Sequence, residues 1–185
     1  MITNFRVWIF FSLIIFGGCK SQTVAHNSDS STIPTICKPY FIYDNVEHYY
    51  IDISEGDELQ LENKKKKTGS EKKLLDLLIQ DSPYTLADTP VLKNIVEIGF
   101  IRKDLPTGKL QKIKDLFCER KIIEVLSLTC DAVYRDILIF KQQNNIVGTA
   151  KICFKCNQIV IAGTSGETED FGQSGEFTEL YNLLH

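Results

Sequence analysis

Several familiar functional patterns are missing from this sequence of 185 residues. No apolar run approaches the roughly twenty residues that a membrane-spanning helix needs. No Gly-x-Ser-x-Gly nucleophile motif is present, and no internal repeat is evident. Acidic residues (24) outnumber Lys and Arg (21), which argues against a globally basic nucleic-acid-binding protein. We therefore predict no catalytic residues, no cofactor and no nucleic-acid partner.

The N-terminus, by contrast, has the three parts of a secretion signal. Arg6 supplies a positive charge, residues 7–16 form a short apolar stretch, and Gly17 and Gly18 follow as a small-residue site. The apolar stretch is about half the length of a spanning helix, so it is not expected to remain as a transmembrane anchor.

The residue after this small pair is Cys19. The segment Phe16-Gly17-Gly18-Cys19 resembles the lipobox of bacterial lipoproteins, with Phe16 in place of the usual Leu. This resemblance implies that residues 1–18 are removed and that Cys19 carries the lipid. Because lipoproteins carry two or more acyl chains at this position, it also implies stable attachment to a membrane.

The same resemblance suggests an address within the cell envelope. Lys20 follows Cys19, whereas enteric lipoproteins that stay at the inner membrane have Asp there. The segment Lys20-Ser21-Gln22 also lacks the acidic residues that accompany surface export in some Bacteroidota lipoproteins. We therefore expect a lipid-anchored protein of the outer membrane that faces the periplasm, with another envelope protein as a candidate partner.

Three regions follow from this interpretation. Residues 1–18 are the signal, residues 19–36 are polar and rich in Ser and Thr and are expected to be a flexible tether, and residues 37–185 form the folded part. That length suits a single domain with its own core.

The first half of residues 37–185 mixes strand and helix signals. We predict two strands at residues 40–43 and 48–53, a loop at 55–58, and helices at 70–80, 92–99 and 107–118, where apolar side chains recur every three or four residues. The alternative for residues 92–99 is a short strand around Ile95-Val96-Glu97-Ile98.

The second half gives the clearest fold signal. Apolar, β-branched runs separated by polar turns predict an antiparallel meander, followed by a glycine-rich loop and a short final helix; the runs are residues 122–128, 134–140, 146–154 and 158–162, the loop is 163–175 and the helix is 177–184. We therefore expect an α+β fold in which helices pack on one face of the sheet.

The cysteines raise a pairing problem. If Cys19 carries lipid, five of the six cysteines remain, so one or two disulfides and a free thiol are expected outside the cytoplasm. Cys153 and Cys156 form a CxxC motif within strand-like sequence, where a direct disulfide is hard to close. We favour a disulfide from Cys130 to one of these two.

A CxxC motif also occurs in three other kinds of site. A thioredoxin-like site needs a helix after the motif, and a c-type haem site needs His where this chain has Asn157. A zinc site formed by Cys130, Cys153 and Cys156 with Cys118 or a histidine stays an alternative, although a second CxxC or an HxxxH is absent. The three histidines, His26, His48 and His185, are far apart in the sequence.

Two further observations concern the meander. Tyr134-Arg135-Asp136 at its start favours internal pairing, with a polar-ligand site as the alternative. Residues 130–140 together with 152–156 resemble uncharacterised secreted bacterial proteins that have the same order of Cys, strand and CxxC. That resemblance implies that Cys130, Cys153 and Cys156 belong to one unit, and it implies no activity.

From these observations we expect an envelope lipoprotein whose domain is a non-enzymatic binding or structural module. The alternative is a thiol redox or metal-binding protein that uses Cys153 and Cys156.

Overall fold

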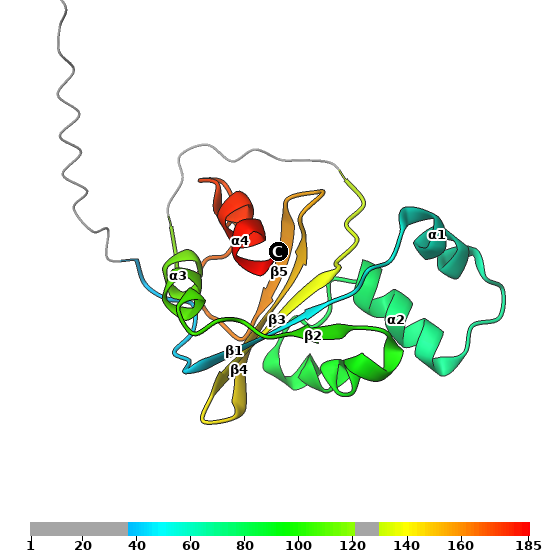
Figure 1. Ribbon diagram of the computed structural model, residues 1–185, viewed down its shortest axis with the longest axis horizontal. Helices are drawn as coiled ribbons and strands as arrows, with labels where there is room; N and C mark the ends of the chain where they lie inside the picture. The colour runs from blue at the N-terminus through cyan, green and yellow to red at the C-terminus, as the bar shows by residue number, and fades with distance from the viewer. Residues whose placement is uncertain (1–36, 121–129) are drawn as a thin grey trace, which may run out of the picture. The chain divides into compact units, whose positions relative to one another are not determined.

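The computed structural model describes residues 37–120 and 130–185 (Figure 1). The signal, the lipid attachment at Cys19, the tether and the strand at residues 122–128, all predicted from the sequence, lie outside the described residues. Residues 37–120 and 130–185 fall within one compact unit. Within the described part, no helix is both long enough and apolar enough to cross a membrane.

A five-stranded antiparallel sheet forms the centre of the fold, in the order β2-β1-β3-β4-β5. The strands are β1 (Asn45–Tyr50), β2 (Ile101–Lys103), β3 (Asp136–Gln142), β4 (Asn145–Cys153) and β5 (Gln158–Ala162). Together with the helices described below, the sheet confirms the α+β class.

The meander β3-β4-β5 was predicted from sequence and is confirmed. Gln143 and Asn144 join β3 to β4 with positive φ angles of 49° and 67°, which fit a tight hairpin turn. Asn157, with φ of 49°, ends the turn between β4 and β5. Strand β1 pairs with β3 along its whole length, and β2 forms the edge beyond it.

Helical elements cover both faces of the sheet. On one face, Leu138 and Phe140 pack with α3 (Lys109–Leu116) and α4 (Glu176–Leu184). On the other, Ile137 and Ile139 pack with α2 (Gly69–Ile79) and with the 3-10 helices η1 (Leu86–Leu92) and η2 (Ile95–Ile98). Figure 1 shows the two groups on opposite sides of the strands.

The expectation that helices pack on one face only is therefore wrong in this respect. The reason is visible in β3, where residues 137–140 are apolar at every position and are all buried. Since successive side chains of a strand point to opposite faces, such a run needs a cover on each side.

Three predicted helices are confirmed. Helix α2 begins one residue before Ser70, and Thr68, not Ser70, caps it through a reciprocal capping box with Glu71. Helix α3 ends at Leu116, and α4 buries Phe177, Leu180 and Leu184.

Other boundaries differ from the prediction. Residues 40–43 form no strand, although Tyr40 and Tyr43 are buried in the core, and the strand expected at 48–53 lies instead at Asn45–Tyr50. Residues 92–99 contain short 3-10 turns that end at Gly99, whose φ of 112° suits glycine.

The loop predicted at residues 55–58 is instead the start of helix α1 (Glu55–Asn63). The Ser54 hydroxyl accepts a hydrogen bond from the Asp57 backbone N–H at 3.1 Å, which caps the first turn. The negative charges of Glu55, Asp57 and Glu58 in that turn also interact favourably with the positive end of the helix dipole. These local interactions replace the apolar periodicity that the segment lacks.

Two disulfides join distant parts of the chain. Cys37 is bonded to Cys118, beside a backbone bridge between Pro39 and Cys118. Cys130 is bonded to Cys156. Cys153 is the free cysteine among the described residues, and it is buried. The disulfides expected from the cysteine count are therefore present.

Candidate functional site

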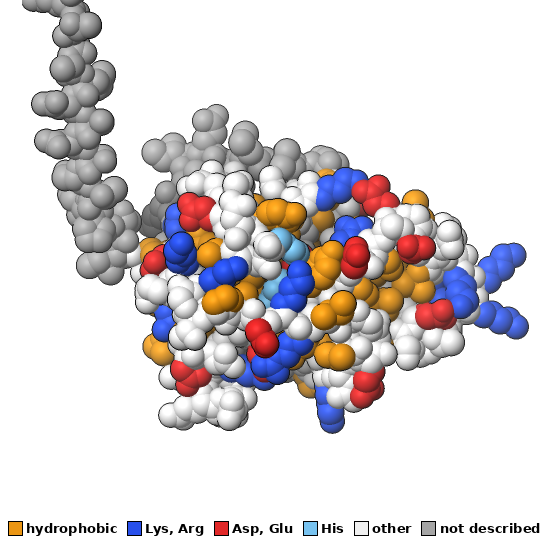
Figure 2. Space-filling model, viewed as in Figure 1, with side chains coloured by type: hydrophobic (Ala, Val, Ile, Leu, Met, Phe, Trp, Pro, Cys, Tyr) orange, Lys and Arg blue, Asp and Glu red, His pale blue; other side chains and the backbone are white. Residues whose placement is uncertain are grey.

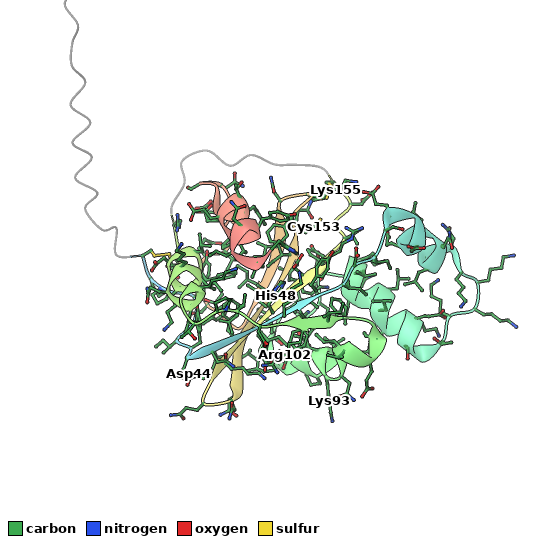
Figure 3. The ribbon with its side chains drawn as sticks, in the orientation of Figure 1. Asp44, His48, Lys93, Arg102, Cys153 and Lys155 are labelled. Carbon is green, nitrogen blue, oxygen red and sulfur yellow. A yellow bond between two sulfur atoms is a disulfide. The ribbon has the colours of Figure 1, made fainter. Side chains whose placement is uncertain are left out.

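The three cysteines that the sequence analysis grouped lie together at one end of the meander. Cys153 is the last residue of β4, Cys156 lies in the turn that follows, and Cys130 precedes β3. Cys130 and Cys156 form a disulfide with Cα atoms 5.8 Å apart, whereas Cys153 packs beside Cys156 and Tyr134 as a free thiol. Figure 3 places Cys153 and Lys155 at this end of the sheet.

All three cysteines line a cavity of about 450 Å³. Helix α1 contributes carboxylates to its wall, whereas Arg135 and Lys155 contribute positive charge. Lys155 forms an ion pair with Glu55, and the pKa of the Glu55 carboxyl is lowered by that hydrogen bond and charge. The wall also includes Glu58, Leu59, Glu62, Ile79, Asp131, Ala132 and Val133. We call this hollow the cysteine cavity.

The surroundings of Cys153 differ from those of a thioredoxin-like nucleophile. Cys153 ends a strand, and β5 follows the turn, so the CxxC motif does not lead into a helix. The motif therefore lacks the following helix whose backbone donors and dipole activate the thiol in thioredoxin-like sites. In this disulfide state Cys130 and Cys156 offer no thiolates, so a zinc site made of the three cysteines is not assembled.

A second cluster is formed by His48, Asp136 and His185. Asp136 Oδ1 lies 2.7 Å from His48 Nε2 and 3.1 Å from His185 Nε2. In the sheet register His48 lies opposite Leu138 and Tyr50 opposite Asp136, so His48 and Asp136 are diagonal neighbours on one face. His185, at the end of α4, covers them from that face. We call these residues the histidine cluster.

The histidine cluster is enclosed by aromatic rings. His185 stacks on Tyr181 with ring centroids 4.7 Å apart and meets Tyr50 and Phe154 edge to face. Burial lowers the pKa of the His185 imidazole, with the nearby Asp136 carboxylate opposing this effect. His48 is fully buried, and its Nδ1 has no hydrogen-bond partner among residues 37–120 and 130–185.

Sequence reasoning missed this cluster. The histidines are scattered along the chain and Asp136 belongs to the segment Tyr134-Arg135-Asp136, so no sequence pattern groups these residues. The available signal was Asp136 itself, a carboxylate next to four apolar residues of a buried strand. Such a residue needs a buried partner, although the sequence does not name one.

The other two members of that tripeptide do pair internally. The Tyr134 hydroxyl donates to Asp81 Oδ1 at 2.7 Å, and Arg135 Nε donates to the Ile53 carbonyl at 3.0 Å. Burial raises the pKa of the Tyr134 phenol, and the hydrogen bond with Asp81 adds to this effect.

Lys151 is a buried cation on the opposite face of the sheet from the histidine cluster. Its ammonium donates to the carbonyls of Gln80 and Ser82 at the end of α2 and lies over the Tyr134 ring. Burial lowers the pKa of Lys151 to about 8. The nearby Asp81 and Asp76 carboxylates act in the opposite direction, because they stabilise the charged ammonium. Since Lys151 completes the C-terminal end of a helix, its role in the fold is structural.

Comparison of the chain with protein-family models, with curated proteins and with solved structures gives no match.

Proposed function

We propose that this chain is a lipid-anchored protein of the bacterial cell envelope, whose domain is a non-enzymatic binding module attached to the outer membrane through Cys19. The observation that carries the proposal is the pair of disulfides, Cys37–Cys118 and Cys130–Cys156. Disulfides persist mainly in oxidising compartments, which a chain reaches by export. The signal-like residues 1–18 supply a route for that export.

The cysteine cavity is the surface that we propose for binding. Its volume of about 450 Å³ lies in the range of small-ligand pockets, and its wall carries charges of both signs beside apolar atoms. Such a wall suits a polar ligand or a short segment of an envelope partner. The Cys130–Cys156 disulfide holds one side of the cavity in place.

Lipid attachment is tested with radiolabelled fatty acid in cells that express the full chain. The wild-type chain and the control Cys153→Ala are expected to incorporate label, and Cys19→Ala is expected to lose it. Continued labelling of Cys19→Ala, or an unlabelled wild-type chain, would contradict the anchor.

Binding at the cysteine cavity is tested with a photo-crosslinking amino acid in intact cells. Leu59 lines the cavity and is 52% exposed. Val96 is 57% exposed and is not part of the cavity wall, so it serves as the control. We expect a discrete adduct from position 59 and none from position 96. Equal adducts at both positions would indicate chance collisions and would remove the cavity from the proposal.

A second candidate function is favoured by the position of Cys153. Its free thiol shares the cavity wall with the Cys130–Cys156 disulfide. As a thiolate, Cys153 could attack Cys156 Sγ, forming a Cys153–Cys156 disulfide and releasing Cys130 as a thiolate, with no net oxidation. Cys130 is exposed, so its released thiolate could then react with a partner's disulfide.

The two candidates are separated by mapping disulfides by mass spectrometry after exposure to a glutathione redox buffer. Thiol exchange predicts a fraction of molecules with Cys153–Cys156 and a free Cys130, and none in Cys153→Ser. If Cys153 stays unpaired while Cys130–Cys156 persists, the thiol function is rejected and the binding module stands.

A further inference from the structure

We infer that the histidine cluster, His48, Asp136 and His185, is a binding site for one divalent transition-metal ion of the zinc class. The inference goes beyond the proposed binding module and uses neither the cysteine cavity nor the lipid anchor. It rests on the convergence of three ligand atoms from three separate elements, β1, β3 and the end of α4.

The distances between the donor atoms are close to those of a metal site. One ligand atom from each of the three residues lies within 4.8 Å of the other two. Asp136 Oδ1 is 2.7 Å from His48 Nε2 and 3.1 Å from His185 Nε2. Ligands of one tetrahedral zinc ion lie about 3.4 Å apart, given bonds of 2.0–2.2 Å. Small side-chain shifts that lengthen the two carboxylate–imidazole distances toward this value would therefore admit the ion.

The cluster is also held firmly enough to present these atoms. His48 and Asp136 lie on paired strands in the middle of the sheet, and both side chains are almost fully buried. The His185 side chain is 19% exposed, and the rings of Tyr50, Phe154 and Tyr181 fix its plane. Histidine atoms are visible on the face shown in Figure 2, among hydrophobic and basic atoms, and the partly exposed side chain of the cluster is that of His185.

The donor set selects the class of metal. Two imidazoles and a single carboxylate suit zinc and its first-row neighbours, whereas calcium and magnesium need more oxygen ligands. Three protein ligands also leave a fourth position for water. The free thiol cannot contribute, because Ile152 lies opposite Asp136 and Cys153 therefore points to the other face of the sheet.

Two neighbouring features weaken the affinity for a cation. The Lys103 ammonium lies 4.5 Å from the centre of the Tyr50 ring, and the same ring meets His185, so a positive charge lies near the cluster. In addition, His48 binds a metal through Nε2 only with its proton on Nδ1, and that nitrogen has no acceptor in the described part of the chain. Since such outer partners contribute ten- to a hundredfold in affinity, we expect a moderate site and not a permanently filled one.

The test is calorimetric titration of the full-length protein, purified without a polyhistidine tag, with Zn²⁺ and separately with Co²⁺. All samples carry Cys19→Ser and Cys153→Ser, which removes both cysteines outside the two disulfides. We expect one ion per chain, with cobalt giving the visible absorption bands of nitrogen and oxygen coordination.

Variants then assign the site. Asp136→Asn keeps the shape of the side chain, and His185→Gln changes a residue at the surface; each is expected to lower zinc affinity at least tenfold. The control Glu97→Gln, an exposed carboxylate outside the cluster, is expected to leave affinity unchanged. Lys103→Gln removes a nearby positive charge and is expected to raise affinity up to about fivefold.

Each variant is checked by circular dichroism and by the mass of its disulfide-linked peptides, so that loss of binding is not confused with loss of folding. If Asp136→Asn fails to fold, long-range nitrogen NMR spectra of the unmodified cluster decide, because zinc must shift the Nε2 resonances of both His48 and His185. Absence of saturable binding, or binding that persists in both cluster variants, overturns the inference. Either result leaves the proposed binding module unaffected.

Discussion

The two disulfides are expected to differ in how much they stabilise the domain. Cys37–Cys118 links residues separated by 81 positions, and Cys130–Cys156 links residues separated by 26. In the chain-entropy description, a cross-link stabilises mainly by restricting the unfolded state, and more so for a longer loop. These separations correspond to about 4.5 and about 3.5 kcal/mol at 25 °C.

The two loops do not overlap along the chain, so their effects are expected to add. The sum is about 8 kcal/mol, which is comparable to the whole stability of an ordinary domain. We therefore expect Cys37→Ala/Cys118→Ala to be less stable than Cys130→Ala/Cys156→Ala by about 1 kcal/mol. The quadruple variant is expected to be largely unfolded.

The assay is urea unfolding followed by circular dichroism, with Cys153→Ala as the control that removes a buried thiol without removing a cross-link. Each double variant is also expected to show a steeper dependence on urea, because its unfolded chain exposes more surface. The reasoning is refuted if the two double variants are equally stable, or if loss of the shorter loop costs more.

Three further predictions concern the packing and charge of the domain. Gly148→Ala is expected to lower the urea midpoint by the equivalent of about 1–3 kcal/mol, because the added Cβ would overlap the Phe41 ring; an unchanged midpoint would contradict that packing. Thr68→Ala is expected to cost about 1 kcal/mol through loss of the α2 cap, whereas Ser70→Ala, at a residue inside the first turn, should change thermal stability little. The pKa of Lys151 is about 8 in the folded state and about 10.4 in the unfolded state. Between these values the unfolded state binds more protons, so the stability of the fold should rise by up to about 2 kcal/mol from pH 8 to 9.5. Urea titrations of Lys151→Met at the two pH values should show no such rise in stability.

The sequence predicted those parts of the fold whose signals are local. The meander could be predicted because β-branched runs alternate with polar turns. One such turn is at Gln143 and Asn144, which adopt positive φ. Helix α1 was missed because its stabilisation comes from the Ser54 cap and an acidic first turn, while Gly56 and scarce apolar residues suggested a loop. Its start shows that capping can outweigh a weak pattern.

The candidate sites divide in the same way. Cys130, Cys153 and Cys156 lie close enough in the sequence to be grouped by the order of Cys, strand and CxxC. A direct Cys153–Cys156 disulfide is hard to close within a strand, which favoured a bond from Cys130 to one of them. His48, Asp136 and His185 come from three separate parts of the chain, and only the sheet register and the position of α4 bring them together. No spacing rule connects residues that meet through tertiary structure alone.

The position of β1 in the sheet has a consequence for how the domain folds. Strand β1 comes first in the chain, yet it pairs with β3, whose partner residues follow some ninety positions later in the sequence. The hairpins of the meander can form as soon as their strands are available, whereas the central β1–β3 pairing must wait for a long loop to close. The Cys37–Cys118 bond closes most of that same loop. A chain oxidised at this pair therefore begins refolding with its slowest encounter largely complete, and a reduced chain searches for it unaided.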